Sequence, residues 1–510
     1  MLAKLMSYGL VGITGIPISV EVDLSSGMQR VETVGLPDNA VKESKERVHS
    51  AISNSGYAYP EMRVIVNLAP ADIKKEGTVY DLPIALGILA ARGIFPLRAA
   101  EDYVIIGELA LDGSVRAVTG VLPMVINAYE RGFRHFMLPL ANAVEASFFA
   151  DMNVIPVKNL SEACGHFKGI APIDPWPQLS WSDQKVNYSH DFAEIKGQQH
   201  AKRAAEIAVA GNHNLLMIGS PGSGKTMLAR SIPSILPELS MEESLEITRI
   251  HSVAGELRGG SGIITERPFR APHHSASIPA LVGGGSKALP GEISLAHYGV
   301  LFMDEFPQFP TNVLEALRQP LEDGVVTITR ASAKTTYPAE FMLVAAMNPC
   351  PCGNFGSKHK ECRCTPMQIE KYRNRISSPL LDRLDIHIEM TEVEYDELTS
   401  KAKGECSAAI RERVCRARRI QKERYKDEGI LFNSQLNTPL MRKYCSMTDD
   451  AEKMLHTAYD RFKLSARAYT RVIKVARTIA DISGEAIIDK QHVLEAVQYR
   501  GLDEKYWGSR

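Results

Sequence analysis

Residues 214–226 carry the side chains with the clearest chemistry in this chain. The run NLLMIGSPGSGKT joins an apolar stretch to a glycine loop, and a helical segment follows. Glycines adopt positive φ readily and carry no side chain, so successive backbone N–H groups can surround phosphate oxygens. The spacing G-x-x-x-x-G-K-[ST] therefore predicts a nucleoside triphosphate site. The predicted binding loop consists of Gly219, Ser220, Pro221, Gly222, Ser223, Gly224, Lys225 and Thr226.

The end of this loop predicts where ATP and Mg²⁺ are held. Lys225 is placed to reach the β and γ phosphates, and the Thr226 hydroxyl to ligate the magnesium ion that bridges them. The N-terminus of the following helix adds partial positive charge. The alternative is an ordinary glycine-rich turn, which the flanking apolar run and helix disfavour.

A second motif supplies carboxylates. The run GVLFMDEF, from Gly299 to Phe306, is an apolar strand that ends in two acids. We predict that Asp304 holds the magnesium ion through its hydration shell and that Glu305 polarises the attacking water. A third apolar run ends in Asn348, whose amide is predicted to orient that water. The alternatives are an acidic surface turn and an asparagine that caps the turn before Pro349.

Four cysteines follow the third run. Cys350, Cys352, Cys362 and Cys364 have the spacing C-x-C-x9-C-x-C. Four thiolates on one loop suit a tetrahedral structural zinc site, although two-residue spacers are commoner. A bound metal would stiffen the loop that leads to the arginines at 373, 375 and 383. The alternative is a set of reduced cysteines in a turn.

Composition limits the class of protein. The chain has 510 residues, with 59 Lys plus Arg against 60 Asp plus Glu, so net charge gives no nucleic-acid signal. This length suggests about three domains. The apolar opening is broken by glycines and a proline and lacks a cleavage site, so we expect turns and a strand rather than a signal peptide. Eight cysteines and no long apolar run fit a soluble, cytoplasmic chain without membrane partners.

The pattern of elements divides the chain into an α+β N-terminal domain, a linker, a parallel α/β core and a helical C-terminal lid. We expect boundaries at 1–168, 169–190, 191–395 and 396–510, with three prolines near the start of the linker. In the first domain, strands are expected at Val20–Leu24, Arg63–Leu68, Tyr103–Leu109 and His135–Leu138, and helices at Asn39–Ser53 and Leu82–Ala91.

Several motifs together resemble an AAA+ ATPase of the magnesium-chelatase-related branch. They are the glycine loop, GVLFMDEF, Asn348, YRNRISSPLLDRLD and SARAYTRVIKVARTIAD, and they span residues 190–500. The resemblance implies that Arg383 is the arginine finger and Arg467 the sensor-2 arginine, with Arg375 and Arg471 as alternatives. Because an AAA+ finger completes a neighbour's site, it also implies a head-to-tail ring, a hexamer.

The interval between Thr226 and Asp304 is longer than one helix and one strand require. It contains LVGGG and RPFRAPHHSAS, which resemble the helix-2 insert of this ATPase branch. A further hairpin is expected in VVTITRASAKTTYP. Basic side chains on such loops would follow a DNA backbone, and the candidates are Arg267, Arg270, Arg330 and Lys334. The alternative is that these loops are simply solvated. The two histidines lack a carboxylate or cysteine partner for a metal within their own motif.

The N-terminal segment from Gly77 onward resembles the proteolytic domain of Lon. That family places a serine nucleophile where this chain has Val79 or its neighbours, and a lysine base where it has Leu122, and neither Val79 nor Leu122 can do the chemistry. The resemblance thus implies a Lon-like fold without peptidase activity, used for assembly, substrate guidance or nucleic-acid contact. A rearranged pair of Thr78 and Lys75 is the alternative.

A Lon-like domain in front of this ATPase module is the arrangement of the magnesium-chelatase-like proteins. The resemblance implies a hexameric, ATP-driven motor that promotes DNA branch migration during natural transformation, with single-stranded and branched DNA and recombination proteins as partners. Two rival classes stay open: a magnesium-chelatase motor subunit or other protein-remodelling ATPase, and an ATP-dependent protease. The basic helix 408–426 suits phosphate binding or a solvated bridge between core and lid equally well.

Overall fold

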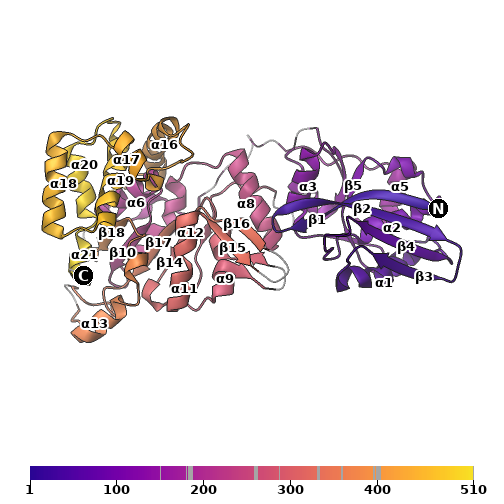
Figure 1. Cartoon of the computed structure of the whole chain (residues 1–510), viewed down its shortest axis with the longest axis horizontal. Helices are drawn as coiled ribbons and strands as arrows, with labels where there is room; N and C mark the ends of the chain where they lie inside the picture. The colour runs from indigo at the N-terminus through magenta and orange to yellow at the C-terminus, as the bar shows by residue number, and fades with distance from the viewer. Residues whose placement is uncertain are drawn as a thin grey trace. The chain divides into compact units, whose positions relative to one another are not determined.

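The computed structural model describes residues 1–149, 151–179, 181, 186, 188–257, 262–285, 288–329, 334–357, 360–393, 397 and 404–508. The chain packs as two compact units (Figure 1). The first comprises Met1–Lys185 and Ser240–Thr265, and the second comprises Val186–Leu239 and Glu266–Arg510. Within the described ranges, no helix is long and apolar enough to cross a membrane.

The first unit is built on a seven-stranded mixed sheet, in the order β3-β4-β2-β1-β5-β8-β9. β1, β2 and β4 pair antiparallel, whereas β3 and the strands beyond β1 pair parallel to their neighbours. The strands are β1 (Leu2–Val11), β2 (Thr14–Ser25), β3 (Arg30–Val34), β4 (Arg63–Ala69), β5 (Tyr103–Ile105), β8 (His135–Pro139) and β9 (Asn153–Val157). A small separate ladder joins β6 (Glu108–Leu109) to β7 (Val115–Arg116).

The helices of the first unit pack on this sheet. Every residue of α2 is buried, because its sequence DLPIALGILAA is apolar on all sides. The predicted strands and helices of this part are confirmed to within a few residues, except that the expected strand 103–109 divides into β5 and β6 and β2 is longer than expected. The helices are α1 (Asn39–Asn54), α2 (Asp81–Ala91), α3 (Val121–Glu130), α4 (Ala143–Ala146) and α5 (Leu160–Phe167).

One helix of the first unit comes from far along the chain. α8 (Met241–Ala254) starts with a capping box between Ser240 and Glu243 and packs against α3. The Gly120 amide donates to the Ser252 carbonyl (3.1 Å), and the Ser252 hydroxyl donates to Glu145 Oε2 (3.2 Å). The stretch therefore belongs by packing to the first unit, although it lies within the range predicted as ATPase core.

The second unit contains a five-stranded sheet in which all neighbours are parallel, in the order β11-β14-β17-β10-β18. Its central strands are buried on both faces and read as continuous apolar runs, as parallel sheets require. The predicted parallel α/β core is thus confirmed. The strands are β10 (Leu215–Gly219), β11 (Phe269–Arg270), β14 (Val300–Met303), β17 (Met342–Met347) and β18 (Ile386–Met390).

Short helices connect the strands. They are α6 (Gln199–Gly211), α7 (Lys225–Ser231), α9 (Ile278–Val282), α10 (Glu292–Leu295), α11 (Thr311–Ala316), α12 (Arg318–Asp323), α13 (Pro366–Arg373) and α14 (Ser378–Leu381). Two hairpins project among them. β12 (Gly283–Gly284) pairs with β13 (Leu289–Pro290), and β15 (Val325–Thr329) pairs with β16 (Lys334–Pro338).

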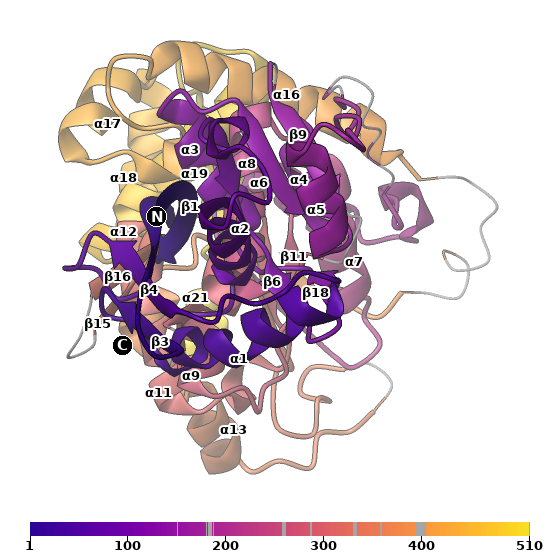
Figure 2. The same ribbon diagram turned by 90° about the vertical axis from the view of Figure 1, so that its right-hand side faces the viewer.

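The described residues after 404 are largely helical (Figures 1 and 2). α19 packs against α20, α16 and α6, and it buries the predicted apolar positions Val472, Val475, Ala476 and Ile479. The helix also buries Asp481, which binds two arginine side chains, those of residues 424 and 477. The elements are α16 (Ser407–Arg424), α17 (Thr438–Tyr444), α18 (Asp449–Phe462), α19 (Ala466–Ser483), α20 (Lys490–Gln498) and α21 (Leu502–Trp507).

Candidate functional site

The carboxyl ends of three adjacent strands bring the predicted nucleotide residues together. The glycine loop follows β10, Asp304 and Glu305 follow β14, and Asn348 follows β17. Since β14, β17 and β10 are parallel neighbours, their carboxyl ends share one edge of the sheet. The loop, both acids and Asn348 line one pocket of about 770 Å³. This is a volume typical of sites for small molecules and cofactors.

The glycine loop has the backbone that phosphate binding needs. Gly222 and Gly224 lie at φ 85° and 91°, and Gly224 caps the N-terminus of α7. Gly219 lies so close to the end of β18 that an added Cβ would be 2.5 Å from the Met390 carbonyl oxygen. A side chain at that position would displace the loop from the sheet.

Lys225 lies folded against its own loop. Its Nζ donates to the carbonyl oxygens of Gly219 (2.7 Å) and Ser220 (2.9 Å) and lies 3.4 Å from Asn348 Oδ1. Burial lowers the pKa of Lys225, and the nearby Asp304 carboxylate opposes that shift. The ammonium group is therefore held inside the loop, at the position from which it would meet phosphate oxygens.

The residues predicted to hold magnesium are in direct contact. Thr226 Oγ1 donates to Asp304 Oδ2 at 3.0 Å, although the two residues are far apart in sequence. A hydroxyl and a carboxylate beside a phosphate loop are the hard oxygen ligands that Mg²⁺ prefers. The arrangement therefore fits a magnesium nucleotide.

Glu305 has a partner that the sequence did not identify. Its backbone is left-handed, at φ 50° and ψ 42°, a conformation that costs a non-glycine residue about 1–3 kcal/mol. Its Oε2 lies 3.3 Å from His274 Nδ1, and the His274 and His273 rings lie with centroids 4.1 Å apart at an interplanar angle of 35°. The histidine motif follows β11, which pairs with β14, so a predicted pairing of these strands would have revealed the contact.

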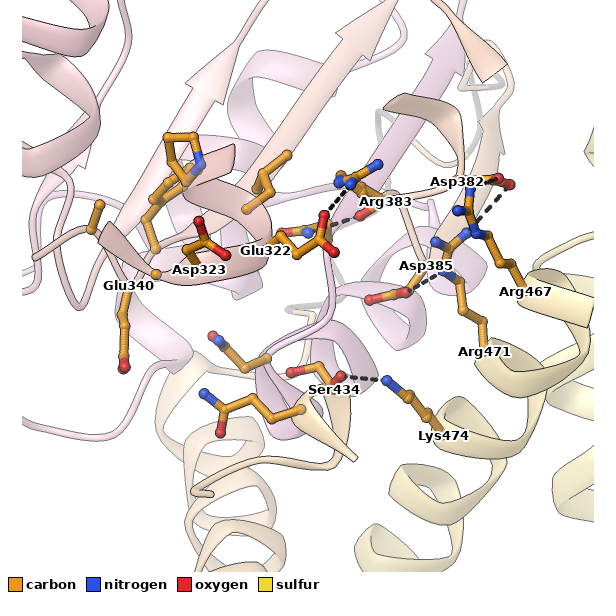
Figure 3. Close-up of a pocket in the computed structure, with 18 of the residues that line it drawn as sticks. Glu322, Asp323, Glu340, Asp382, Arg383, Asp385, Ser434, Arg467, Arg471 and Lys474 are labelled. Atoms are coloured by element: carbon orange, nitrogen blue, oxygen red, sulfur yellow. Dashed lines mark hydrogen bonds and ion pairs between the residues drawn. The ribbon is translucent and has the colours of Figure 1, made fainter. Parts of the chain in front are cut away.

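A second pocket, of about 480 Å³, is lined by the predicted finger Arg383, the predicted sensor-2 residue Arg467 and the alternative Arg471. Figure 3 shows Arg467, Arg471 and Lys474 projecting from α19 into it, and Arg383 beside Glu322. Residues at i, i+4 and i+7 share one face of a helix, and the Ser465 side chain caps the start of α19. We call this set of four cations (Arg383, Arg467, Arg471 and Lys474) the arginine face.

Each arginine of this face is paired with an acid. Arg383 binds Glu322, whose side chain is 66% exposed. Arg467 lies 3.3 Å from Asp382 and is itself 68% exposed. Arg471 lies 3.1 Å from Asp385. Pairs that reach the solvent are weak, so Arg383 and Arg467 can exchange partners at small cost.

Asp385 holds the base of the arginine face. Burial alone would raise its pKa, but the hydrogen bond and charge of His213, together with Arg471 and Lys474, lower the pKa of Asp385 to about 2. Burial also lowers the pKa of Arg471, against the effect of Asp385. His213 is fully buried, and its other ring nitrogen lies 2.8 Å from Thr478 Oγ1. Charges packed this closely fix α19 against the start of β18.

The arginine face and the glycine loop lie at opposite ends of the strands of the sheet. Asn214, the residue before β10, donates through Nδ2 to the Arg383 carbonyl oxygen (2.8 Å), whereas Ser220 is the residue after β10. A strand of this length spans roughly 16 Å at about 3.3 Å per residue. The two pockets share no lining residue. The structure therefore does not bring Arg383 or Arg467 to the glycine loop of the same chain.

The residues predicted to contact DNA differ in what they bind. Arg267 donates to the carbonyl oxygens of Pro237 (2.6 Å) and Tyr298 (2.8 Å). Arg270 forms a bidentate pair with Glu292 at 2.6 and 2.8 Å. Both guanidinium groups thus have intramolecular partners. Lys334 is exposed at the end of the β15–β16 hairpin, where it pairs with Thr329, and Arg330 lies outside the described residues.

The four clustered cysteines converge on one point. Their sulfur atoms all lie within 4.8 Å of one another, and Cys350 is buried. This donor set is compatible with Zn²⁺, which takes four thiolates in a tetrahedron. Arg375, an alternative finger in the segment that follows, is exposed.

In the first unit, the positions matched to the Lon nucleophile and base are core residues. Val79 and Leu122 are both buried. Thr78 donates to Glu108, and the buried Lys75 side chain donates to the Pro70 carbonyl oxygen. Thr78 and Lys75 therefore each have a different partner.

Three family models match the chain. Residues 191–398 match the model described as magnesium chelatase, subunit ChlI. Residues 20–142 match subunit ChlI of Mg-chelatase, and residues 404–500 match the C-terminal part of magnesium chelatase subunit ChlI. The matches cover the five-stranded sheet of the second unit, part of the sheet of the first unit, and the C-terminal helices from α16 to α20.

Curated relatives match over nearly the full length. Competence protein ComM of Haemophilus influenzae is 44% identical over 507 residues, covering 98% of both chains. The YifB protein of Escherichia coli is 43% identical over 495 residues, covering 96% of both. A magnesium-chelatase subunit ChlI homolog of Methanocaldococcus jannaschii is 22% identical, covering 61% of this chain and 84% of its own.

Proposed function

The chain belongs to the magnesium-chelatase-like family of the ComM and YifB proteins, and from this premise we propose that it is an ATP-hydrolysing motor that acts on DNA. More specifically, we propose a head-to-tail hexamer that promotes branch migration when incoming DNA recombines during natural transformation. The observation that carries the DNA assignment is the near full-length similarity to a competence protein.

The nucleotide chemistry follows from the first pocket. Backbone N–H groups of the glycine loop and Lys225 would bind the phosphates, while Thr226 and Asp304 would hold Mg²⁺. When bound, Mg²⁺ neutralises charge that develops on the phosphate oxygens. Glu305 would take the proton of the attacking water, and Asn348 would orient that water. His274 would hold the Glu305 carboxylate before hydrolysis begins.

The arginine face supports a ring. Arg383 and Arg467 lie at the end of the strands opposite their own glycine loop. They therefore suit a nucleotide bound by the next chain. A guanidinium fork stabilises the charge that spreads over phosphoryl oxygens during transfer. Each chain would then contribute the phosphate loop to one interface and the arginines to the other, which is a heterologous contact that closes into a ring.

Other parts of the chain have roles consistent with this proposal. Lys334, on an exposed hairpin, would contact a DNA backbone, and residues 396–510 would act as the lid that carries Arg467. The N-terminal domain would serve assembly or substrate guidance without peptidase chemistry, since Val79 and Leu122 are buried. A cytoplasmic location fits the eight cysteines, all of which are free thiols.

A second function is favoured by the family models, whose descriptions name a magnesium-chelatase subunit. A motor of that class remodels a partner protein rather than DNA, and fold alone does not separate the two. The substrate that stimulates ATP hydrolysis does separate them.

Steady-state ATPase of the purified chain, with and without single-stranded and branched DNA at two salt concentrations, tests the proposal. A Glu305→Gln variant serves as the control for contaminating ATPases. We expect stimulation by DNA that weakens at higher salt, because phosphate contacts release counterions. A basal rate that no DNA changes at low salt would contradict the DNA assignment and favour protein remodelling.

A further inference from the structure

The cysteine loop between β17 and α13 has the dimensions of a metal site. Cys350 Sγ lies 3.4 Å from Cys352 Sγ and 3.7 Å from Cys362 Sγ, and Cys352 Sγ lies 3.7 Å from Cys362 Sγ. Tetrahedral Zn–S bonds of about 2.3 Å place sulfur atoms about 3.8 Å apart. The Phe355 amide also donates to Cys350 Sγ (3.3 Å), a hydrogen bond that stabilises a thiolate.

The same loop lies directly against the phosphate-binding loop. Gly353 has φ 82°, and its amide donates to the Cys350 carbonyl oxygen (3.0 Å) in a tight turn. A Cβ added at Gly353 would lie 2.6 Å from Pro221 Cδ and 2.8 Å from Pro221 Cγ. The backbone of the turn after the first two cysteines therefore lies against the ring of Pro221, in the middle of the glycine loop.

A buried arginine holds the loop from another direction. Arg373 donates through Nε (3.1 Å) and Nη2 (3.0 Å) to the Pro349 carbonyl oxygen and through Nη1 to that of Tyr506 (2.9 Å). Its guanidinium also stacks on the rings of Phe355 and Tyr506, at 4.8 and 4.7 Å from their centroids. Arg373 thus fixes the start of the loop.

We propose that the four cysteines hold one Zn²⁺ ion, and that this metal clamps the turn at Gly353 against Pro221 so that the glycine loop keeps its phosphate-binding conformation. Binding displaces the thiol protons to solvent and joins residues ten or more positions apart across the loop. Zinc would then be a determinant of nucleotide affinity as well as of local folding. The inference rests on the proposed binding of ATP.

Metal content and nucleotide affinity, measured without DNA, test this inference. Zinc per chain is determined by elemental analysis after metal-replete expression, and affinity by titration with a fluorescent ATP analogue and Mg²⁺. We expect about one zinc per chain in the wild type, and almost none with at least tenfold weaker binding in a Cys350→Ser, Cys362→Ser double variant. Cys415→Ser, which removes a thiol of α16 outside the cluster, is the matched control and should change neither value.

Two glycine variants distinguish the effect of the Gly353–Pro221 contact on nucleotide affinity from the effect of the metal. Gly353 and Gly356 have φ of 82° and 80°, so alanine causes similar backbone strain at both, but nothing lies within 4 Å of a Cβ at Gly356. We expect Gly353→Ala to retain zinc and to weaken nucleotide binding, and Gly356→Ala to leave affinity near that of the wild type. Equal loss of affinity in both variants would overturn the role of the Pro221 contact.

The outcomes distinguish this inference from the proposed function. A wild-type chain without zinc would overturn the metal site. A zinc-free double variant with wild-type affinity would overturn the clamp alone and leave the proposed ATPase intact. A wild-type chain that binds no nucleotide would overturn the proposed function, and with it the clamp.

Discussion

Complementation between two inactive variants tests whether the arginine face serves a neighbouring chain. Lys225→Ala removes the phosphate ligand from the glycine loop and leaves the arginine face complete. Arg383→Ala removes the finger and leaves the glycine loop complete. Because the two residues lie at opposite ends of the strands, each mutation would damage a different interface of the proposed ring.

The expected rates follow from this geometry. An arginine finger contributes about 10³–10⁵ in rate, or roughly 4–7 kcal/mol of transition-state stabilisation, so Arg383→Ala alone should be nearly inactive. In an equimolar, randomly mixed ring, a working interface needs the Arg383→Ala chain on the loop side and the Lys225→Ala chain on the arginine side. Each has a probability of one half, so about a quarter of the interfaces would be complete. The exposed pair that Arg383 leaves, with Glu322, costs only about 0.2–1 kcal/mol.

The assay is steady-state ATP hydrolysis by each variant alone and by the co-assembled mixture, with DNA present. We expect the mixture to recover up to about a quarter of the wild-type rate if each site hydrolyses ATP independently, and less if the sites hydrolyse ATP in a concerted manner. Recovery from two nearly inactive proteins requires residues from different chains to act at one nucleotide.

A mixture no more active than the sum of its parts would refute this reasoning, provided that sizing shows mixed rings. Arg375→Ala is the matched control, because Arg375 is an exposed arginine of the same segment outside the pocket. If Arg375→Ala complemented Lys225→Ala and Arg383→Ala did not, the finger would be assigned to the wrong residue.

Three further changes have defined outcomes. His274→Ala removes the partner of Glu305 and should raise the DNA-independent ATPase rate severalfold with unchanged nucleotide affinity; a fall in both basal and stimulated rates would show that the imidazole assists hydrolysis. Lys334→Ala should keep basal ATPase and weaken its stimulation by DNA, and undiminished stimulation would exclude this lysine from the DNA path. Asp481→Asn leaves the buried Arg477 and the partly buried Arg424 without their carboxylate and should lower the free energy of unfolding by about 3–5 kcal/mol in chemical denaturation; a change below about 1 kcal/mol would mean that the site relaxes.

Much of the second unit was predictable because its signals are local. The glycine loop, the acidic pair and Asn348 each follow an apolar run, and parallel strands bring their carboxyl ends to one edge. The structure accordingly lines one pocket with Lys225, Asp304, Glu305 and Asn348. Buried parallel strands are recognisable from their continuous apolar sequence, so the core sheet was predicted correctly.

Contacts between distant segments were not predictable in this way. The histidine that lies against Glu305 carries no signal in its own motif, since the contact depends on β11 lying beside β14. The packing of α8 on α3 likewise joins segments more than a hundred residues apart. The arginines of the insert illustrate the converse, because Arg267 and Arg270 are basic in sequence but have intramolecular partners in the fold.

The chemistry of each short segment could be predicted from residue types alone: a phosphate loop, a carboxylate pair, four thiols and two arginine motifs. Their types and spacing follow from covalent neighbours, so they can be read without a fold. The fold was needed to show that the arginines lie a strand's length from their own glycine loop and that the cysteine turn lies against Pro221. Those relations depend on strand order and on packing between residues distant in sequence, and no local pattern encodes them.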